Sequence, residues 1–191
     1  MASSGIYRYV ASRDELLTAL IVEAYDSIGA AAEAAAEASA GDAAAPRLRA
    51  VCQAMRIWAA EHVHEYALLY GSPVPGYQAP ESTIPAASRV ALALLGVIDD
   101  GWVAGELVAP ASANVARIGP GLAADLRRLR ADAGLELPDV VVPRLLIVWM
   151  QLFGAISLEL FGHTMGVVEA HDELFDAVME TMLEQLGLAP R

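Results

Sequence analysis

Four histidines and a single cysteine are the side chains best suited to metal or nucleophilic chemistry. His62 and His64 are two residues apart, so on a helix they point to nearly opposite sides and do not share a metal ion. The pairs His62–Tyr66 and Glu159–His163 have a suitable four-residue spacing, but such pairs more commonly form hydrogen bonds. We therefore predict neither a metal site nor a cofactor.

The cysteine and the glycines do not form an enzyme motif either. Cys52 falls within an apolar helical pattern and has no obvious activating base, as expected for a small core residue. The sequence contains no G-x-S-x-G elbow, no G-x-G-x-x-G fingerprint and no P-loop, and no strand is expected before the Gly119-Pro120-Gly121 segment. An enzyme is therefore the least favoured class of function.

Aromatic and sulphur-containing side chains gather in and around the central helices. One interpretation is ordinary core packing. The other is an apolar ligand site, because several of these residues combine an apolar ring with a polar tip. The residues predicted for the ligand site are Met55, Trp58, His62, Tyr66, Tyr70, Trp102, Trp149 and Phe153.

Periodic apolar residues predict the helices that position these side chains. A composition with 56% hydrophobic residues and few aromatics favours packed helices over sheets. The run Ser12-Arg13-Asp14-Glu15 is typical of a capping box, so a helix is expected from Ser12 to about Ser39. A proline- and glycine-rich loop is expected over residues 71–80. Further helices are expected over Leu48–His62, Glu65–Tyr70, Ala86–Val103 and Leu122–Asp132.

Two long apolar helices are expected near the C-terminal end, from Pro138 to Gly162 and from about Val168 to Leu186, with Gly187 as a stop signal. The former is apolar nearly all round, but polar residues including Arg144 and Glu159 interrupt it, so it lacks the uncharged run of a membrane helix. Burial on several sides, some of them by a partner subunit, explains it better. The predicted dimer contacts are Trp149, Leu152, Ile156, Leu160, Phe175, Val178 and Met182.

Charge is unevenly distributed along the chain. The formal net charge is −12, which repels a phosphate backbone. Residues 1–13 contain Arg8 and Arg13 and no acidic residue, so any contact with nucleic acid is expected there. One cysteine cannot form an internal disulfide, and no signal-peptide pattern opens the sequence. We therefore expect a cytoplasmic protein.

The N-terminal segment, residues 4–17 (SGIYRYVASRDELL), closely resembles the end of the helix-turn-helix of TetR-family transcription regulators. In that family, a recognition helix ending in an aliphatic-Tyr-x-aromatic pattern runs into a capped helix with a basic residue and a leucine pair. Arg13 stands where a lysine or arginine is usual, and Val10 replaces the usual phenylalanine. The patterned positions are occupied by Ile6, Tyr7 and Tyr9.

The rest of the chain resembles TetR regulators whose C-terminal domain is named after a Trp-His-Gly (WHG) signature. Residues 70–77 look like their loop. The pattern Trp149-x-x-Leu-Phe-Gly, followed by residues 157–163, is similar to their dimer helix, and Phe153 stands where the histidine gives the signature its name. The two likenesses together cover almost the whole chain.

The resemblance implies an all-α TetR-like architecture in two parts. Residues 1–11 would be the remnant of a helix-turn-helix DNA-binding domain, and residues 12–191 the ligand-binding and dimerisation domain. By analogy with the family, about three dozen residues of the helix-turn-helix are expected to be missing. The DNA contacts carried over by position are Ser3, Ser4, Tyr7, Arg8 and Arg13.

The resemblance also implies a function. A homodimer would read a two-fold operator as a repressor, and an apolar or aromatic effector bound in the body would shift the separation of the two recognition helices. DNA binding is expected only with a complete helix-turn-helix. The alternative is a DNA-independent dimeric protein that binds an apolar small molecule.

Overall fold

Seven α-helices and one short 3-10 turn make up the part of the chain that the computed structural model describes, residues 12–108 and 118–188. The all-α fold predicted from periodicity and composition is therefore confirmed. In chain order the elements are α1 (Arg13–Ala38), α2 (Ala44–Glu61), α3 (Val63–Tyr70), η2 (Glu81–Thr83), α4 (Ile84–Val103), α5 (Pro120–Asp132), α6 (Val142–Leu160) and α7 (His171–Leu186).

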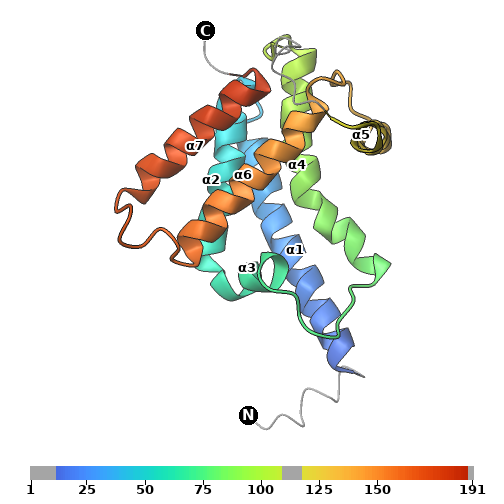
Figure 1. Ribbon diagram of the computed structural model, residues 1–191, viewed down its shortest axis with the longest axis vertical. Helices are drawn as coiled ribbons and strands as arrows, with labels where there is room; N and C mark the ends of the chain where they lie inside the picture. The colour runs from blue at the N-terminus through green and yellow to red at the C-terminus, as the bar shows by residue number, and fades with distance from the viewer. Residues whose placement is uncertain (1–11, 109–117, 189–191) are drawn as a thin grey trace.

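The helices pack around one hydrophobic core. Helix α1 runs through the length of the molecule and packs against α2 and α4, while the short α3 lies across its lower half (Figure 1). Helix α6 crosses α2, and α7 packs beside α6 to form one outer side of the molecule. Helix α5 lies at the edge, where it contacts α6. The apolar stripes that predicted each helix therefore all meet in this core.

Local signals fix several helix ends. The Ser12 hydroxyl oxygen accepts a hydrogen bond from the Glu15 N–H at 3.1 Å, as the capping motif predicted. Gly187 ends α7 in the left-handed region with φ of 85°, which is also the predicted stop. The start of α2 depends instead on a distant residue: the Ala44 N–H donates to Glu106 Oε2 at 2.5 Å, because the preceding alanine has no side chain to cap it.

The predicted starts of the last two helices were wrong by three to four residues. Helix α6 begins at Val142 rather than Pro138, because Pro138 opens a turn in which the Val141 N–H donates to its carbonyl at 2.9 Å. Pro143 occupies the first turn of the helix in its place. Helix α7 begins at His171 rather than near Val168. Both prolines fit the sequence rule for a helix start, and the helix begins beside the second.

Two helices of the described chain, Glu81–Val103 and Val142–Leu160, are long and apolar enough to pass a test for membrane spans. Each also contributes fully buried side chains to the core, such as Val90 on α4 and Leu152 on α6. A core helix passes the same test, so length and composition by themselves do not indicate a membrane here.

Helices α1 and α4 come close together at Gly29. A Cβ atom built on Gly29 would lie 2.7 Å from Arg89 Cβ, closer than such atoms approach in folded proteins. Arg89 then reaches along α1 and donates to Asp26 Oδ1 at 2.8 Å and to the two carboxylate oxygens of Glu33 at 2.6 and 2.8 Å. This hydrogen bonding and charge hold the pKa of Glu33 below its usual value. We call this contact the Gly29–Arg89 crossing.

Gly29→Ala is expected to destabilise the protein although alanine favours helices. The helix preference gains about 0.5–1 kcal/mol, but forcing the crossing apart costs about 1–3 kcal/mol, so a net loss of about 1 kcal/mol follows. Gly96→Ala is the matched control, because Gly96 is exposed in the middle of α4 and its added Cβ meets nothing within 4 Å. Thermal denaturation of both variants is the measurement. A Gly29→Ala protein stabilised as much as Gly96→Ala would show that the crossing is loose.

Candidate functional site

Four of the predicted ligand residues form a continuous chain of aromatic contacts. Tyr66 and Tyr70 of α3 have ring centroids 5.0 Å apart, Tyr70 lies 4.4 Å from Phe153 of α6, and Phe153 lies 4.5 Å from Trp149. Tyr25 of α1 adds an edge-on contact with Tyr70 at 6.2 Å. These separations are direct ring contact, so the rings pack on one another between α1, α3 and α6.

Burial governs the chemistry of these tyrosines. The Tyr66 hydroxyl lies 2.9 Å from the Ser157 hydroxyl in a hydrogen bond, and its ring is fully buried. Loss of solvent raises the pKa of Tyr66, and more strongly that of Tyr70, so both phenols stay neutral. The group joins α1, α3 and α6 as a neutral packed cluster rather than as an acid–base site.

The other predicted ligand residues are not part of this chain of ring contacts. Met55 is fully buried, and Trp58 stacks on His62 at 4.8 Å while its indole N–H donates to the Ser27 hydroxyl at 2.9 Å. Trp102 lies at the opposite end of α2, because its neighbour Gly101 packs against Ala44, the first residue of that helix. Ala44 and Trp58 are about 21 Å apart at 1.5 Å per residue. Trp58 and Trp102 therefore do not border one pocket, which corrects the prediction.

An apolar cavity of 160 Å³ lies among α2, α4, α5 and α6, with Met182 of α7 also on its wall. Of the eight predicted ligand residues, Trp149 alone lines it. Sequence reasoning missed the others because aliphatic residues on helical stripes look like ordinary core. The full lining is Leu48, Cys52, Ala91, Leu94, Leu95, Ile98, Leu129, Leu145, Leu146, Val148, Trp149, Leu152 and Met182.

The predicted dimer residues divide into two groups. Trp149, Leu160 and Val178 are partly exposed. Four others are fully buried in the core of their own chain, which corrects their assignment to a subunit interface: Leu152, Ile156, Phe175 and Met182. The apolar side chains that do face outward from α6 and α7 are Leu146, Ile147, Met150, Leu158 and Leu174. We call these five residues the outer face.

A groove of 540 Å³ runs along the outer face between α6 and α7. Its walls include Leu158 and Leu174 together with the small residues Gly154 and Ala155. Within the described residues, three buried polar atoms on its walls have no hydrogen-bond partner: Gln151 Oε1, Thr164 Oγ1 and His171 Nδ1. Buried polar atoms normally have partners, so this groove offers both apolar surface and unused hydrogen-bonding groups.

An ion-pair cluster links α6 and the start of α7 to α2, and its residues Glu159 and Phe175 also line the groove. Arg56 donates to both carboxylate oxygens of Glu159 at 2.7 and 2.8 Å and to Asp172 Oδ1 at 2.8 Å. Its guanidinium also lies 4.8 Å from the centroid of the Phe175 ring. Glu159 therefore pairs with Arg56 in the described structure. Its position is explained without the Glu159–His163 pair that the sequence spacing suggested. No group of three or more metal-ligating residues forms in the described parts of the chain.

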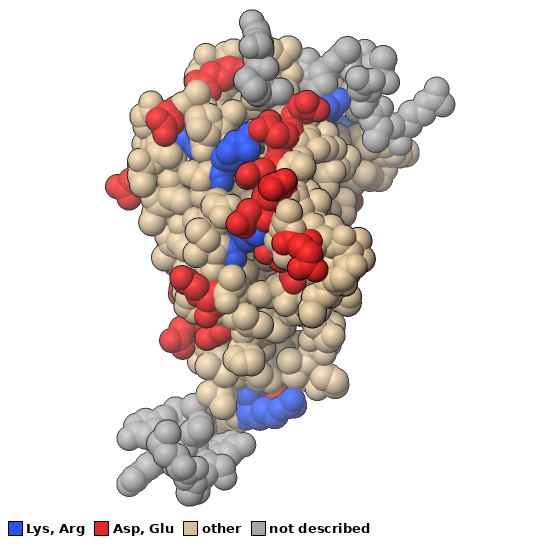
Figure 2. All heavy atoms as spheres, turned by 90° about the vertical axis from the view of Figure 1, so that its left-hand side faces the viewer, with Lys and Arg blue, Asp and Glu red and all other residues tan. Residues whose placement is uncertain are grey.

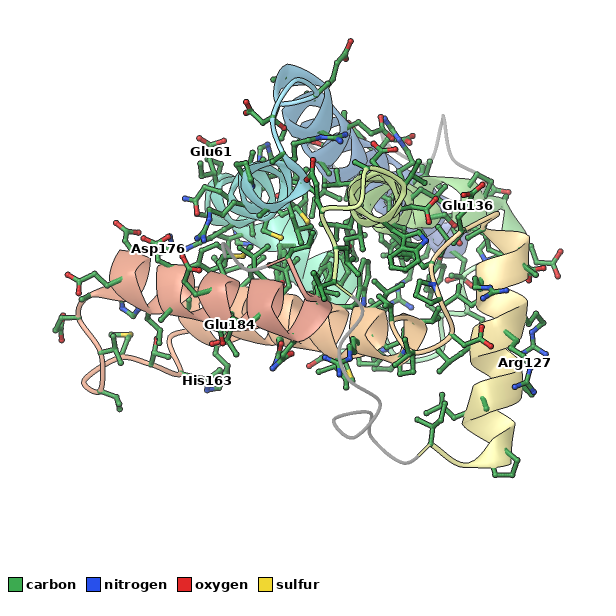
Figure 3. The ribbon with its side chains drawn as sticks, turned by 90° about the horizontal axis from the view of Figure 1, so that it is seen from above. Glu61, Arg127, Glu136, His163, Asp176 and Glu184 are labelled. Atoms are coloured by element: carbon green, nitrogen blue, oxygen red, sulfur yellow. The ribbon has the colours of Figure 1, made fainter. Side chains whose placement is uncertain are left out.

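Acidic side chains dominate the visible surface of the body. Figure 2 shows them spread over this face, with some basic atoms among them and a further basic group at the end where α1 begins. Arg13, the first residue of α1, is exposed there. The other predicted DNA contacts, Ser3, Ser4, Tyr7 and Arg8, lie outside the described residues. On the opposite part of the molecule, Arg127 points outward from α5 into solvent (Figure 3).

Comparison with known proteins decides the family. Residues 48–182 match the family model described as the Tetracyclin repressor-like C-terminal domain. HTH-type transcriptional regulator Rv1816 of Mycobacterium tuberculosis and HTH-type transcriptional regulator Mb1846 of Mycobacterium bovis are each 38% identical over 168 residues, covering 85% of this chain and 68% of each relative. The chain belongs to the TetR family of transcriptional regulators.

Solved structures agree with this TetR-family assignment. SCO4313, a protein described as regulatory, is 32% identical, with a TM-score of 0.71 over 96% of this chain and 80% of that one. A Rhodococcus sp. RHA1 protein of unknown function is 21% identical, with a TM-score of 0.68 over 98% of this chain and 79% of that one, and shows the shared fold. The family consists of transcriptional regulators, which confirms the prediction that this TetR-family protein is not an enzyme.

Proposed function

We propose that this TetR-family chain is the effector-binding and dimerising body of a cytoplasmic transcription repressor. Residues 12–191 form that body in this proposal, and residues 1–11 are the end of the recognition helix. The observation that carries the proposal is the outer face of α6 and α7, because it is an apolar surface at the helices expected to form the dimer.

The outer face has the properties of a two-fold interface. Met150 is 63% exposed and Leu158 is 49% exposed, and they lie eight residues apart on the same side of α6. Soluble monomers rarely expose contiguous apolar patches of this kind. In a two-fold dimer each subunit presents the same patch, so one such face buries the other. A second subunit would also supply partners for the unpaired polar atoms of Gln151, Thr164 and His171.

Dimerisation through this face would direct both copies of the N-terminal segment to DNA. Two copies of a recognition helix bind half-sites related by the same two-fold axis. In the proposed complex Arg13 and Tyr7 contact phosphates, and Ser3, Ser4 and Arg8 contact the groove. The acidic body faces away from the DNA, because its charge repels phosphate. The body binds a small-molecule effector that favours one separation of the two helices over the other.

DNA binding is the direct test of this function. We expect the 191-residue chain to bind weakly to DNA fragments selected from a random pool, and a chain extended by the in-frame codons before Met1 to bind tightly. In the extended protein, Arg13→Ala is expected to reduce the slope of log affinity against log salt by about 1, the value for one lost phosphate contact. Fluorescence anisotropy across a salt series measures this.

Arg127→Ala is the matched control, because it removes an equally exposed arginine from the other end of the body. It is expected to leave the salt slope unchanged. Equal losses in the two variants would indicate a general charge effect rather than a contact. If neither the short nor the extended chain selects any DNA sequence, the DNA-independent binding protein replaces the repressor as the better description.

A further inference from the structure

The cavity among α2, α4, α5 and α6 has almost purely hydrocarbon walls. Leucine, isoleucine, valine and alanine side chains form most of its surface. The non-carbon side-chain atoms are the Cys52 thiol, the Met182 thioether and the Trp149 indole nitrogen. No charged side chain lines it. An ion entering the cavity would lose its hydration without gaining a counter-charge.

The Cys52 thiol shows that the cavity wall disfavours charged groups. Cys52 is fully buried, and burial raises the pKa of its thiol to about 12. The thiol is therefore neutral at physiological pH and contributes a small apolar surface with a weak S–H donor. The wall offers dispersion contacts and little hydrogen bonding, which excludes carboxylates and ammonium groups as favourable guests.

The size of the cavity sets the size of its occupant. Protein cores leave few voids larger than a water molecule, and empty voids are destabilising. The cavity measures 160 Å³, which is close to an apolar cavity of about 150 Å³ known to bind benzene in another protein. The space fits a single ring or a branched hydrocarbon of similar volume.

The cavity comes close to the surface between α5 and α6. Leu129 of α5 and Leu146 of α6 both line it, and each is 37% exposed to solvent. Of the described residues of α5, one, Leu126, is buried in the core. The boundary between α5 and α6 is therefore where the cavity comes nearest to water.

We propose that this cavity is the effector site and that it binds a neutral, compact, apolar molecule of about one ring. The effector role rests on the proposed repressor function, whereas the binding chemistry rests on the cavity itself. Trp149 is the tryptophan on its wall, so occupancy changes the fluorescence of Trp149 and not that of Trp58 or Trp102.

Toluene, benzoate and benzylammonium are suitable probes, because they share a ring and differ in charge. Toluene is expected to raise the melting temperature by several degrees through mass action and to change the fluorescence of a Trp58→Phe, Trp102→Phe variant. The two ions at equal concentration are expected to do neither. A charged probe that binds as tightly as toluene would overturn the assignment of ligand class.

Filling the cavity tests its location. Ala91 lies on the cavity wall, so Ala91→Phe is expected to weaken toluene binding at least tenfold. Leu92→Phe is the control, because Leu92 is exposed on the same helix and does not line the cavity. Unchanged toluene affinity in a folded Ala91→Phe protein would place the binding site elsewhere.

If Ala91→Phe does not fold, Leu95→Ala replaces it as the test variant. The enlarged cavity is expected to favour naphthalene over toluene relative to wild type, and an unchanged preference refutes the site.

The binding assays contain no DNA, which separates the two proposals. Toluene that binds in the cavity without altering DNA affinity would preserve the site and remove its effector role. Absence of toluene binding in a protein that still represses through DNA would refute the cavity assignment alone.

Discussion

A Met150→Arg, Leu158→Arg double variant is expected to be monomeric at concentrations where the wild-type protein is a dimer. Both side chains lie on the outer face of α6, and two-fold symmetry places each substitution in the interface twice. Burying unpaired charges costs several kcal/mol, so the dissociation constant is expected to rise by a factor of about 10³ or more. Sedimentation velocity over a concentration series measures the change.

The control places the same charges on apolar residues elsewhere. Ile57 of α2 and Val103 of α4 are 48% and 65% exposed, and neither belongs to the outer face. An Ile57→Arg, Val103→Arg protein is expected to dimerise like the wild type. If the Met150→Arg, Leu158→Arg protein still dimerises and this control does not, the interface does not lie on α6.

Ile156→Arg is expected to unfold the protein rather than separate two folded subunits. Ile156 is 2% exposed and packs in the core of its own chain. A buried charge without a partner, together with lost packing, costs about 5 kcal/mol or more, which is comparable with the total stability of many domains, about 5–15 kcal/mol. Circular dichroism during thermal denaturation is expected to show no cooperative transition.

Leu158→Arg is the matched control for this result, because it adds the same charge two residues away on the exposed side of α6. It is expected to retain the helical signal and a cooperative transition. A folded, monomeric Ile156→Arg protein would mean that Ile156 faces a partner subunit and not its own core.

These two positions show how much of the proposed interface could be predicted from the sequence. The sequence identifies α6 as apolar nearly all round and indicates that a partner covers part of it. Periodicity alone does not distinguish Ile156, which faces the core, from Leu158, which faces outward. Both sides of the helix carry the same residue types, so the distinction depends on where α2 and α7 pack.

Helix ends that depend on nearby residues could be predicted from the sequence, whereas an end that depends on a distant residue could not. Ser12 and Gly187 act on their own backbone, and both ends were predicted correctly. The cap of α2 comes from Glu106, which lies 62 residues from Ala44 along the chain. No local pattern contains that information.

The candidate ligand site was harder to predict, because a cavity is a space that side chains leave unfilled and no residue type marks such a space in the sequence. Aromatic residues with polar tips were the visible signal, but Tyr66, Tyr70 and Phe153 fill space by packing on one another. The space left open lies among aliphatic residues such as Leu94 and Ile98. Their sequence pattern is the same whether the core around them is full or hollow.

If the Gly29–Arg89 crossing acted as a pivot in the proposed repressor, α1 would move as a lever. At 1.5 Å per residue α1 is about 39 Å long, and Arg13 lies about 24 Å from the pivot at Gly29. Helix α4, which forms the other half of the pivot, also forms one wall of the cavity. A tilt of about 5° at the pivot displaces the Arg13 end by about 2 Å. In the proposed dimer, two-fold symmetry would repeat the motion in the second subunit. Such a tilt would then change the span between the two N-terminal ends by up to about 4 Å, against proposed half-sites about 34 Å apart.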